Sequence, residues 1–362
     1  MSRLQKIANL RDGLMNEKPE LVGQVTAIRE SAVAKLPDLV AMATETLQQK
    51  LAKVYLAKDA AEAAVILGNL LQGEAEVCRA NSSVLAEVGF DKLMSQRKIT
   101  VNLTSLEEVI QQEMGLPGCG HPHFSVLDQP REALEATLCH FVGADDKRSA
   151  QELARLAKEK VRERIVRSGY GVTGVDFVVA ENGVLVLAED QGNVRAVSNL
   201  PYKHVAVVGL EEVIASAEDA ALLVQAASIF GAGRITPTYV SFIAGPSRTA
   251  DIEFRMAYGM HGPKEVHVIL LDNGRLAIRN QGAAPLLKCI NCGSCYESCS
   301  ELAQRQQWTD VTLTPKGLAL GLAQGRLTPA KQKLQIGEFS CPVGLSAAEV
   351  SEKLASILPG IA

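Results

Sequence analysis

Short apolar runs alternate with amphipathic helical periods over most of the chain, from Lys53 to about Asn280. Strands separated by helices favour an α/β fold with a mostly parallel sheet, because parallel strands need a crossover connection. The apolar pattern predicts strands at 53–57, 99–103, 124–128, 204–209 and 236–245, and helices at 59–71, 106–112, 130–141, 149–168 and 210–230.

Two Asn-Gly pairs interrupt β-rich segments. Asn182-Gly183 lies inside 177–189, and Asn273-Gly274 lies inside 265–278. An Asn-Gly pair between apolar arms is a strong signal for a tight hairpin turn. The sequence therefore predicts two β-hairpins within the α/β region.

The two ends of the chain have a different texture. Residues 1–52 carry apolar residues at three- and four-residue steps, which predicts a helical arm that packs on the rest. Residues 282–362 have few strand signals and several helical ones, such as 346–358. We expect three units: an N-terminal helical segment (1–52), an α/β domain (53–281) and a small helical ferredoxin-type module (282–362).

Composition excludes several classes of function. The chain has 362 residues, a formal net charge of −4, 47% hydrophobic residues and only 4% aromatic residues. It shows no basic surface for nucleic acid or anionic lipid, no apolar run of transmembrane length and no secretory h-region. With cysteines spaced for metal rather than for disulfides, we expect a cytoplasmic protein.

The cysteines suggest the chemistry. Cys289, Cys292, Cys295 and Cys299 fall within eleven residues, and Cys341-Pro342 follows about forty residues later. A C-x2-C-x2-C run lets one tight turn present three thiolates to a [4Fe-4S] cluster, and Gly293 supplies the permissive backbone. The sequence therefore predicts one [4Fe-4S] cluster.

The fourth ligand is open from spacing alone. The economical set is Cys289, Cys292, Cys295 and Cys341. Cys299 is followed by Ser300 rather than by proline, and it is either an orphan or a substitute fourth ligand. Zinc is the rival metal, but zinc sites usually divide their ligands into two pairs.

Two other motifs are weaker. Gly169-Tyr-Gly171-Val-Thr-Gly174 matches the dinucleotide fingerprint, yet it follows a helix and enters a hairpin, so we do not expect nicotinamide binding. Cys119, His121 and His123 could contribute to a second metal site, but no clear fourth donor lies nearby, and a structural loop is the better prediction.

A small anion could bind to either of two loops. The first follows the predicted strand 236–245, and its candidates are Gly245, Ser247, Arg248 and Thr249. The second follows the first hairpin, and its candidates are Asn193 and Arg195. Hydrogen-bonded turns without a ligand are the plain alternative for both.

Several of these segments together resemble the lactate-utilization (LUD) family, in particular the iron–sulfur subunit of a three-protein bacterial L-lactate oxidation system. The resemblance covers roughly residues 53 to 345, and the cysteine motif follows in the order that the family uses. The matching segments are Gly174–Gly183, Gln191–Arg195, Leu200-Pro201 with His204, Thr238–Ser241, Gly245–Thr249 and Leu271–Arg275.

The resemblance implies a fold similar to the sugar-isomerase and CoA-transferase-like folds, with a cluster-bearing tail. It also implies electron transfer from 2-hydroxyacid oxidation to an acceptor, with other subunits of a lactate-oxidising complex or an electron carrier as partners. The family usually has two complete cysteine motifs and an acidic residue where this chain has Gln191. These departures indicate a one-cluster relative.

Two other classes remain open. The α/β domain could be an isomerase or acyl-transfer enzyme, in which Glu181 or Asp190 is the working carboxylate, the 245–249 loop holds a small carboxylate or phosphate, and the cluster is structural. Alternatively, the cluster could be a redox sensor that acts through the N-terminal helices.

Overall fold

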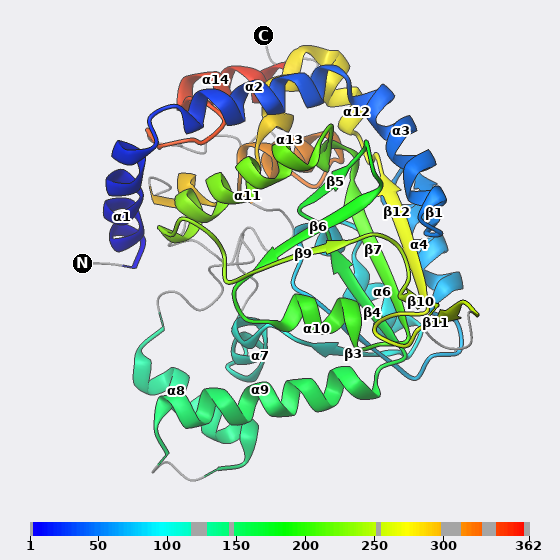
Figure 1. Cartoon of the computed structure of the whole chain (residues 1–362). Coiled ribbons are helices and arrows are strands. Elements are labelled where there is room, and N and C mark those ends of the chain that lie inside the picture. The colour runs from blue at the N-terminus through cyan, green and yellow to red at the C-terminus, as the bar shows by residue number, and fades with distance from the viewer. Residues whose placement is uncertain are drawn as a thin grey trace.

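The computed structural model describes residues 3–116, 129–144, 148–250, 255–297, 313–327 and 338–357, and within them six parallel strands form the central sheet (Figure 1). Every neighbouring pair is parallel, which confirms the α/β class. In spatial order the strands are β1 (Lys53–Ala57), β12 (Glu265–Leu271), β7 (Lys203–Gly209), β4 (Tyr170–Gly174), β2 (Glu76–Arg79) and β3 (Thr100–Leu103).

The middle strands β7 and β12 are buried over all but their first residue. Alternate side chains point to opposite faces of a sheet, so both faces of these strands need apolar residues. Val205 and Val207 join the core on one face, whereas Ala206 and Val208 join the core on the other. This is why both strands appear in the sequence as continuous apolar runs.

Helices cover both faces of the sheet. One core includes buried residues of α4, α5 and α6, and the other includes buried residues of α2, α3 and α11. A third core lies under α7 to α10. The bounds are α2 (Leu21–Ala34), α3 (Leu36–Gln49), α4 (Ala60–Leu70), α5 (Ser83–Glu87), α6 (Phe90–Gln96), α7 (Leu106–Glu113), α8 (Arg131–Val142), α9 (Ala150–Arg167), α10 (Asn193–Asn199) and α11 (Ala217–Ala232).

A second sheet, in the order β8-β5-β6-β9, contains the first predicted hairpin. Strands β5 and β6 are antiparallel, and Gly183 has the positive φ of +66° that the turn requires. A short antiparallel pair, β10 with β11, follows further along the chain. The bounds are β5 (Phe177–Val179), β6 (Val184–Glu189), β8 (Val213–Ile214), β9 (Tyr239–Ile243), β10 (Arg248–Thr249) and β11 (Ala257–Tyr258).

The second predicted hairpin is wrong. Strand β12 already has parallel neighbours on both sides, β1 and β7, so no antiparallel partner can add there. Asn273 and Gly274 instead turn the chain from β12 into the short helix α12 (Arg275–Ile278), and the Asn273 side chain accepts a hydrogen bond from Ala60 N at 3.1 Å.

The predicted helix over 210–230 is shorter than expected. A 3₁₀ turn, η2 (Leu210–Glu212), and strand β8 come first, and α11 begins at Ala217. Ser216 and Asp219 form a capping box at this start, which fixes the boundary. The predicted strand 124–128 lies outside the described residues.

The N-terminal helices and the cysteine module share one apolar core with the second sheet and α11. Figure 1 shows α2 and the red helix α14 along the same side of the molecule. In the part of the chain that is described, none of the helices combines the length and apolarity needed to cross a bilayer. The remaining bounds are α1 (Arg3–Glu17), η3 (Arg279–Ala283), η4 (Ala284–Lys288), η5 (Ser294–Glu297), α13 (Pro315–Ala323) and α14 (Ala347–Ser356).

Candidate iron–sulfur site

Four cysteines from two distant segments line one pocket. Cys289 and Cys292 lie in the loop after η4, Cys295 lies in η5, and Cys341 comes from the segment before α14. These are the four residues that the sequence selects as the economical ligand set. The alternative ligand, Cys299, lies outside the described residues.

Apolar residues supply much of the remaining pocket wall. They are Ile290, Pro315, Phe339, Pro342 and Val343. An apolar wall limits the access of water to the sulfurs, which is one of the factors that tune an iron–sulfur centre.

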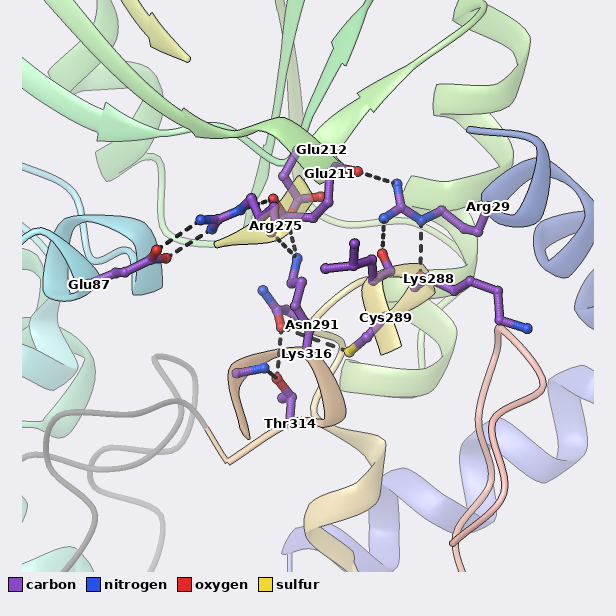
Figure 2. A network of polar contacts seen from close by, with 12 residues as sticks. Arg29, Glu87, Glu211, Glu212, Arg275, Lys288, Cys289, Asn291, Thr314 and Lys316 are labelled. Atoms are coloured by element: carbon purple, nitrogen blue, oxygen red, sulfur yellow. Dashed lines mark hydrogen bonds and ion pairs between the residues drawn. The ribbon is translucent and has the colours of Figure 1, made fainter. Parts of the chain in front are cut away.

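The first cysteine is held in place by a fully buried arginine from the N-terminal helices. Arg29 of α2 donates hydrogen bonds to Leu287 O at 2.6 Å, to Lys288 O at 2.9 Å and to Glu211 O at 2.8 Å. It therefore connects the residues just before Cys289 to the end of β7. Figure 2 shows these contacts.

The cysteine loop has two residues with positive φ, Asn291 at +53° and Gly293 at +81°. Both residue types tolerate this conformation, and the value for Gly293 confirms the expected permissive backbone. Asn291 also accepts a hydrogen bond from the hydroxyl of Thr314 at 2.9 Å, and its side-chain oxygen lies 3.9 Å from Cys289 Sγ. Arg11 of α1 donates to Ser294 Oγ at 2.9 Å. The cysteine turn is therefore held by Thr314 on one side and by Arg11 on the other.

The thiols influence one another electrostatically. Burial raises the pKa of the Cys341 thiol to about 11, and the nearby Cys289 contributes in the same direction. Burial also raises the pKa of Cys292, with smaller contributions from Cys341 and Cys289. A charge on a neighbouring thiol therefore disfavours a charge on Cys292 or Cys341. Metal binding must therefore displace their protons, as it does in other thiolate sites.

Positive charge is available to offset the thiolates. Thr314 is the N-cap of α13 and accepts a hydrogen bond from Gly317 N at 3.2 Å, so the positive end of this helix dipole lies at the pocket wall. Lys288, adjacent to Cys289, acts to lower the pKa of Cys341. The donor set, the apolar wall and these positive groups fit an anionic iron–sulfur cluster.

Within the described ranges, no group of three or more His, Cys, Asp or Glu side chains is placed to hold a metal ion. The cluster and its ligands therefore stay a prediction. The candidates Cys119, His121 and His123 lie outside the described residues.

A chain of buried charges connects the pocket to the sheet, and sequence reasoning missed it (Figure 2). Arg275 donates to both oxygens of Glu87, at 2.8 and 2.9 Å, and also to Glu211. Lys316, in the first turn of α13, forms ion pairs with Glu211 at 3.1 Å and with Glu212. The Arg275, Glu211 and Lys316 side chains are at most 3% exposed.

The position of this network follows from the topology. Glu211 comes just after β7 and Arg275 just after β12, and the carboxyl ends of adjacent parallel strands share one edge of a sheet. The Glu211 and Arg275 side chains pack closely against the backbone of Gly209. A Cβ at Gly209 would lie 2.3 Å from a Glu211 carboxylate oxygen and 2.6 Å from Arg275 Nε. Charged residues directly after two buried strands were the signal that could have predicted the network.

The first predicted anion loop lies at the opposite edge. Ser247 N donates to Pro263 O at 2.9 Å, just before β12 begins, and Ser247 Oγ accepts from His261 N at 3.1 Å. Arg248 and Thr249 form β10, and Gly245 has a positive φ of +76°. This loop therefore lies near the amino ends of the parallel strands rather than at their carboxyl ends.

The second predicted loop lies at the start of α10. Asn193 donates to Thr104 Oγ1 at 3.3 Å, just after β3, and the side chain of Arg195 is exposed. The other end of α10, at Asn199, faces the Ser247 loop. Gly262 lies between them, because a Cβ at Gly262 would contact both Ser247 and Asn199. The two predicted anion loops therefore lie toward opposite ends of this helix.

The carboxylates considered for an isomerase or acyl-transfer enzyme have structural partners. Glu181 accepts from Ala217 N at 2.9 Å, at the start of α11. Asp190 accepts from Thr238 N at 2.8 Å and pairs with Arg234. Partial burial works to raise the pKa of Asp190, but the hydrogen bonds from Thr238 and the charge of Arg234 outweigh it and leave that pKa lowered.

The fingerprint-like segment 169–174 contains strand β4 at Tyr170–Gly174, and no helix follows it directly. A dinucleotide fingerprint must instead connect a strand to a helix N-terminus. This segment therefore lacks the strand-to-helix context of a dinucleotide fingerprint.

Fold and site together define a class: an α/β protein with a parallel sheet and a four-cysteine pocket linked to the carboxyl edge of that sheet. A family model described as "LUD domain" matches residues 40–271. The chain therefore belongs to the LUD domain family, as the sequence motifs predict.

Similar proteins carry related names. The chain is 30% identical over 274 residues to "Lactate utilization protein B" of Macrococcus caseolyticus, which covers 75% of this chain and 56% of that protein. It is 28% identical over 258 residues to the protein of the same name in Shouchella clausii, covering 71% and 53%. It is 25% identical over 275 residues to "Uncharacterized electron transport protein YkgF" of Escherichia coli, covering 75% and 56%. The chain thus spans about half the length of the curated relatives it matches.

Among solved structures, a DUF162 family protein from Deinococcus radiodurans aligns with a TM-score of 0.36 and 13% identity, covering 65% of this chain and 98% of that one.

Proposed function

We propose that this protein is an iron–sulfur electron-transfer subunit of a bacterial L-lactate (2-hydroxyacid) oxidation system. The observation that carries the proposal is the pocket in which Cys289, Cys292, Cys295 and Cys341 come together from two segments. Membership in the LUD domain family and the names of the relatives, for lactate utilization and for electron transport, support the same assignment.

In this proposal the four cysteine thiolates hold one [4Fe-4S] cluster. Such a cluster supplies reversible one-electron oxidation and reduction when it is bound. The protein's own contribution is to position the sulfurs, to keep water away with the apolar wall and to offset negative charge with Lys288 and the start of α13.

The chain is proposed to work with partners. Oxidation of a 2-hydroxyacid ordinarily requires an organic cofactor or a dedicated base, and Glu181 and Asp190 already have structural partners. We therefore propose that other subunits of a lactate-oxidising complex, or an electron carrier, exchange electrons with this chain.

The experiment starts with anaerobic purification and measurement of iron and sulfide. We expect about four irons per chain, and an EPR signal of the reduced cluster that lactate produces only when candidate partner subunits are present. Each of the changes Cys289→Ser, Cys292→Ser, Cys295→Ser and Cys341→Ser should lower the iron content.

Two cysteines outside the pocket are matched controls. Cys78 and Cys139 are buried and do not line the pocket, so Cys78→Ser and Cys139→Ser should retain the iron content of the unchanged protein. Iron content that is insensitive to the four pocket changes would contradict the proposal. Oxidation of lactate by the chain alone would contradict the requirement for partners, and turnover of a sugar phosphate or CoA ester by cluster-free protein would favour the isomerase or acyl-transfer alternative.

A further inference from the structure

Lys316 is a buried positive charge between the cysteine pocket and the sheet. Its side chain is 3% exposed, and Pro315, the residue before it, lines the pocket. Cys289 is among the groups that interact electrostatically with its ammonium. Figure 2 shows the same region, with Cys289 on one side of Lys316 and Glu211 and Glu212 on the other.

The ammonium keeps its charge despite this burial. Burial works to lower the pKa of Lys316, but Glu212 and Glu211 outweigh it, so the pKa is raised. Glu211 is itself held as a carboxylate: burial would raise its pKa, but Arg275 and Lys316 bring it down to about 2. The Lys316 ammonium and the Glu211 carboxylate are therefore both charged, and Figure 2 shows Glu211 on the far side of Lys316 from Cys289.

Buried charges act strongly on a nearby redox centre because the surrounding medium screens them weakly. The reduced form of a cluster carries one more negative charge than the oxidised form. A positive charge near the pocket therefore stabilises the reduced form, whereas a negative charge stabilises the oxidised form.

We propose that Lys316, held in place by Glu211 and Glu212, sets the reduction potential of the cluster. The reduction potential thereby depends on the charges at the carboxyl edge of the parallel sheet. This inference rests on the proposed function, since it needs a cluster at the four cysteines. Lys316 acts on the cluster through its charge and is not a ligand.

The test is a redox titration of the cluster, followed by EPR, on full-length protein. Lys316→Met removes the positive charge. We expect the midpoint potential to fall by at least about 59 mV, which corresponds to a tenfold shift in the one-electron equilibrium. Lys316→Arg keeps the charge and should stay near the unchanged protein. Glu211→Gln removes a negative charge from the more distant position and should raise the midpoint by a smaller amount.

The opposite signs separate charge from general loosening of the site, which would move both variants in the same direction. Lys353→Met is the matched control, because Lys353 lies on α14 and is paired with the exposed Glu352. The midpoint potential of this variant should change by less than the equivalent of a twofold shift in the one-electron equilibrium. If Lys316→Met holds no iron, Glu211→Gln and Lys316→Arg decide the outcome by the same criteria.

Midpoints that do not move, or that move in the same direction in Lys316→Met and Glu211→Gln, would overturn the inference and leave the proposed function intact. Unchanged protein that binds no iron would instead overturn the proposed function, and this inference with it. Iron and sulfide content, measured first, distinguishes the two failures.

Discussion

The change Arg275→Met tests how strongly the buried charge network stabilises the fold. Arg275 is 2% exposed and donates to Glu87, Glu211 and the carbonyl oxygen of Asp272. Methionine keeps much of the side-chain length but removes all of these donors and the charge. The fold is expected to lose stability because carboxylates that were paired become unpaired in a buried position.

The magnitude depends on which carboxylate is left without a cation. Glu211 keeps Lys316 at 3.1 Å. Among the described residues, Glu87, with a side chain 6% exposed, keeps only neutral donors, the Asn273 amide at 2.6 Å and the Gln324 amide at 2.9 Å. Breaking a buried pair costs about 3–5 kcal/mol. Since only one carboxylate loses its cation, we expect a loss near the lower limit, about 3 kcal/mol.

The assay is urea unfolding followed by circular dichroism, with the free energy of unfolding extrapolated to water. Arg155→Met is the control, because Arg155 and Glu159 form an exposed helical pair at 2.6 Å, and such pairs contribute about 0.5 kcal/mol or less. In the double variant Arg275→Met/Glu87→Gln, no carboxylate is stranded, so it should be more stable than Arg275→Met alone. A loss below about 1 kcal/mol for Arg275→Met, or no recovery in the double variant, would refute this account.

Three further predictions concern pH and cluster retention. The folded-state pKa of Glu211 is about 2, below its ordinary value, so the stabilisation that its charge provides is present above about pH 4.5 and is lost as pH falls. The stability gap between the unchanged protein and Glu211→Gln should therefore narrow on acidification from pH 5 to pH 2; a constant gap would contradict this. Burial lowers the pKa of His204 to about 4, so the protein should lose stability as pH falls from about 6.5 to 4. Urea unfolding at each pH measures this loss, and His204→Gln should remove the part that comes from His204. Arg29→Met should release iron to a chelator faster, because the carbonyl oxygens of Leu287 and Lys288, just before Cys289, and of Glu211 lose their donor; Arg279→Met, which frees the carbonyls of Val33 and Ala34 and the side-chain oxygen of Asn280, is the control and should not.

The parallel sheet was predictable because its central strands are buried on both faces. The runs 203–209 and 265–271 are almost continuously apolar, and such runs are typical of parallel strands covered by helices. The shorter strands β2 and β4 escaped prediction, since four or five residues with a polar or glycine residue among them give little periodicity.

The second Asn-Gly pair shows where local signals fail. Asn273-Gly274 has the backbone conformation that such pairs favour, with positive φ at both residues. The conformation was therefore predictable, but its use was not, because the neighbours of β12 are strands from distant parts of the chain. Tertiary pairing decided whether the turn led into a strand or into a helix.

That four cysteines share one pocket was predictable from the sequence, whereas the surroundings of the pocket were not. Three cysteines within seven residues indicate a shared centre on their own. Arg29 lies about 260 residues before Cys289, and no periodicity in the sequence relates the two. Such contacts arise only when helices from both ends of the chain pack into one core.

The arrangement of charges gives the α/β domain a physical reason to be joined to a cysteine module. Parallel strands end at a common edge, where their last residues can present polar groups toward one place. In this protein that edge holds Glu211 and Arg275, and Lys316 continues the same network to the helix whose start lines the cysteine pocket. A change at the sheet edge that moves Glu211 would therefore alter the electrostatic field at the sulfurs without touching them. We infer that this edge, which binds ligands in many α/β proteins, is coupled to the proposed redox centre through Lys316.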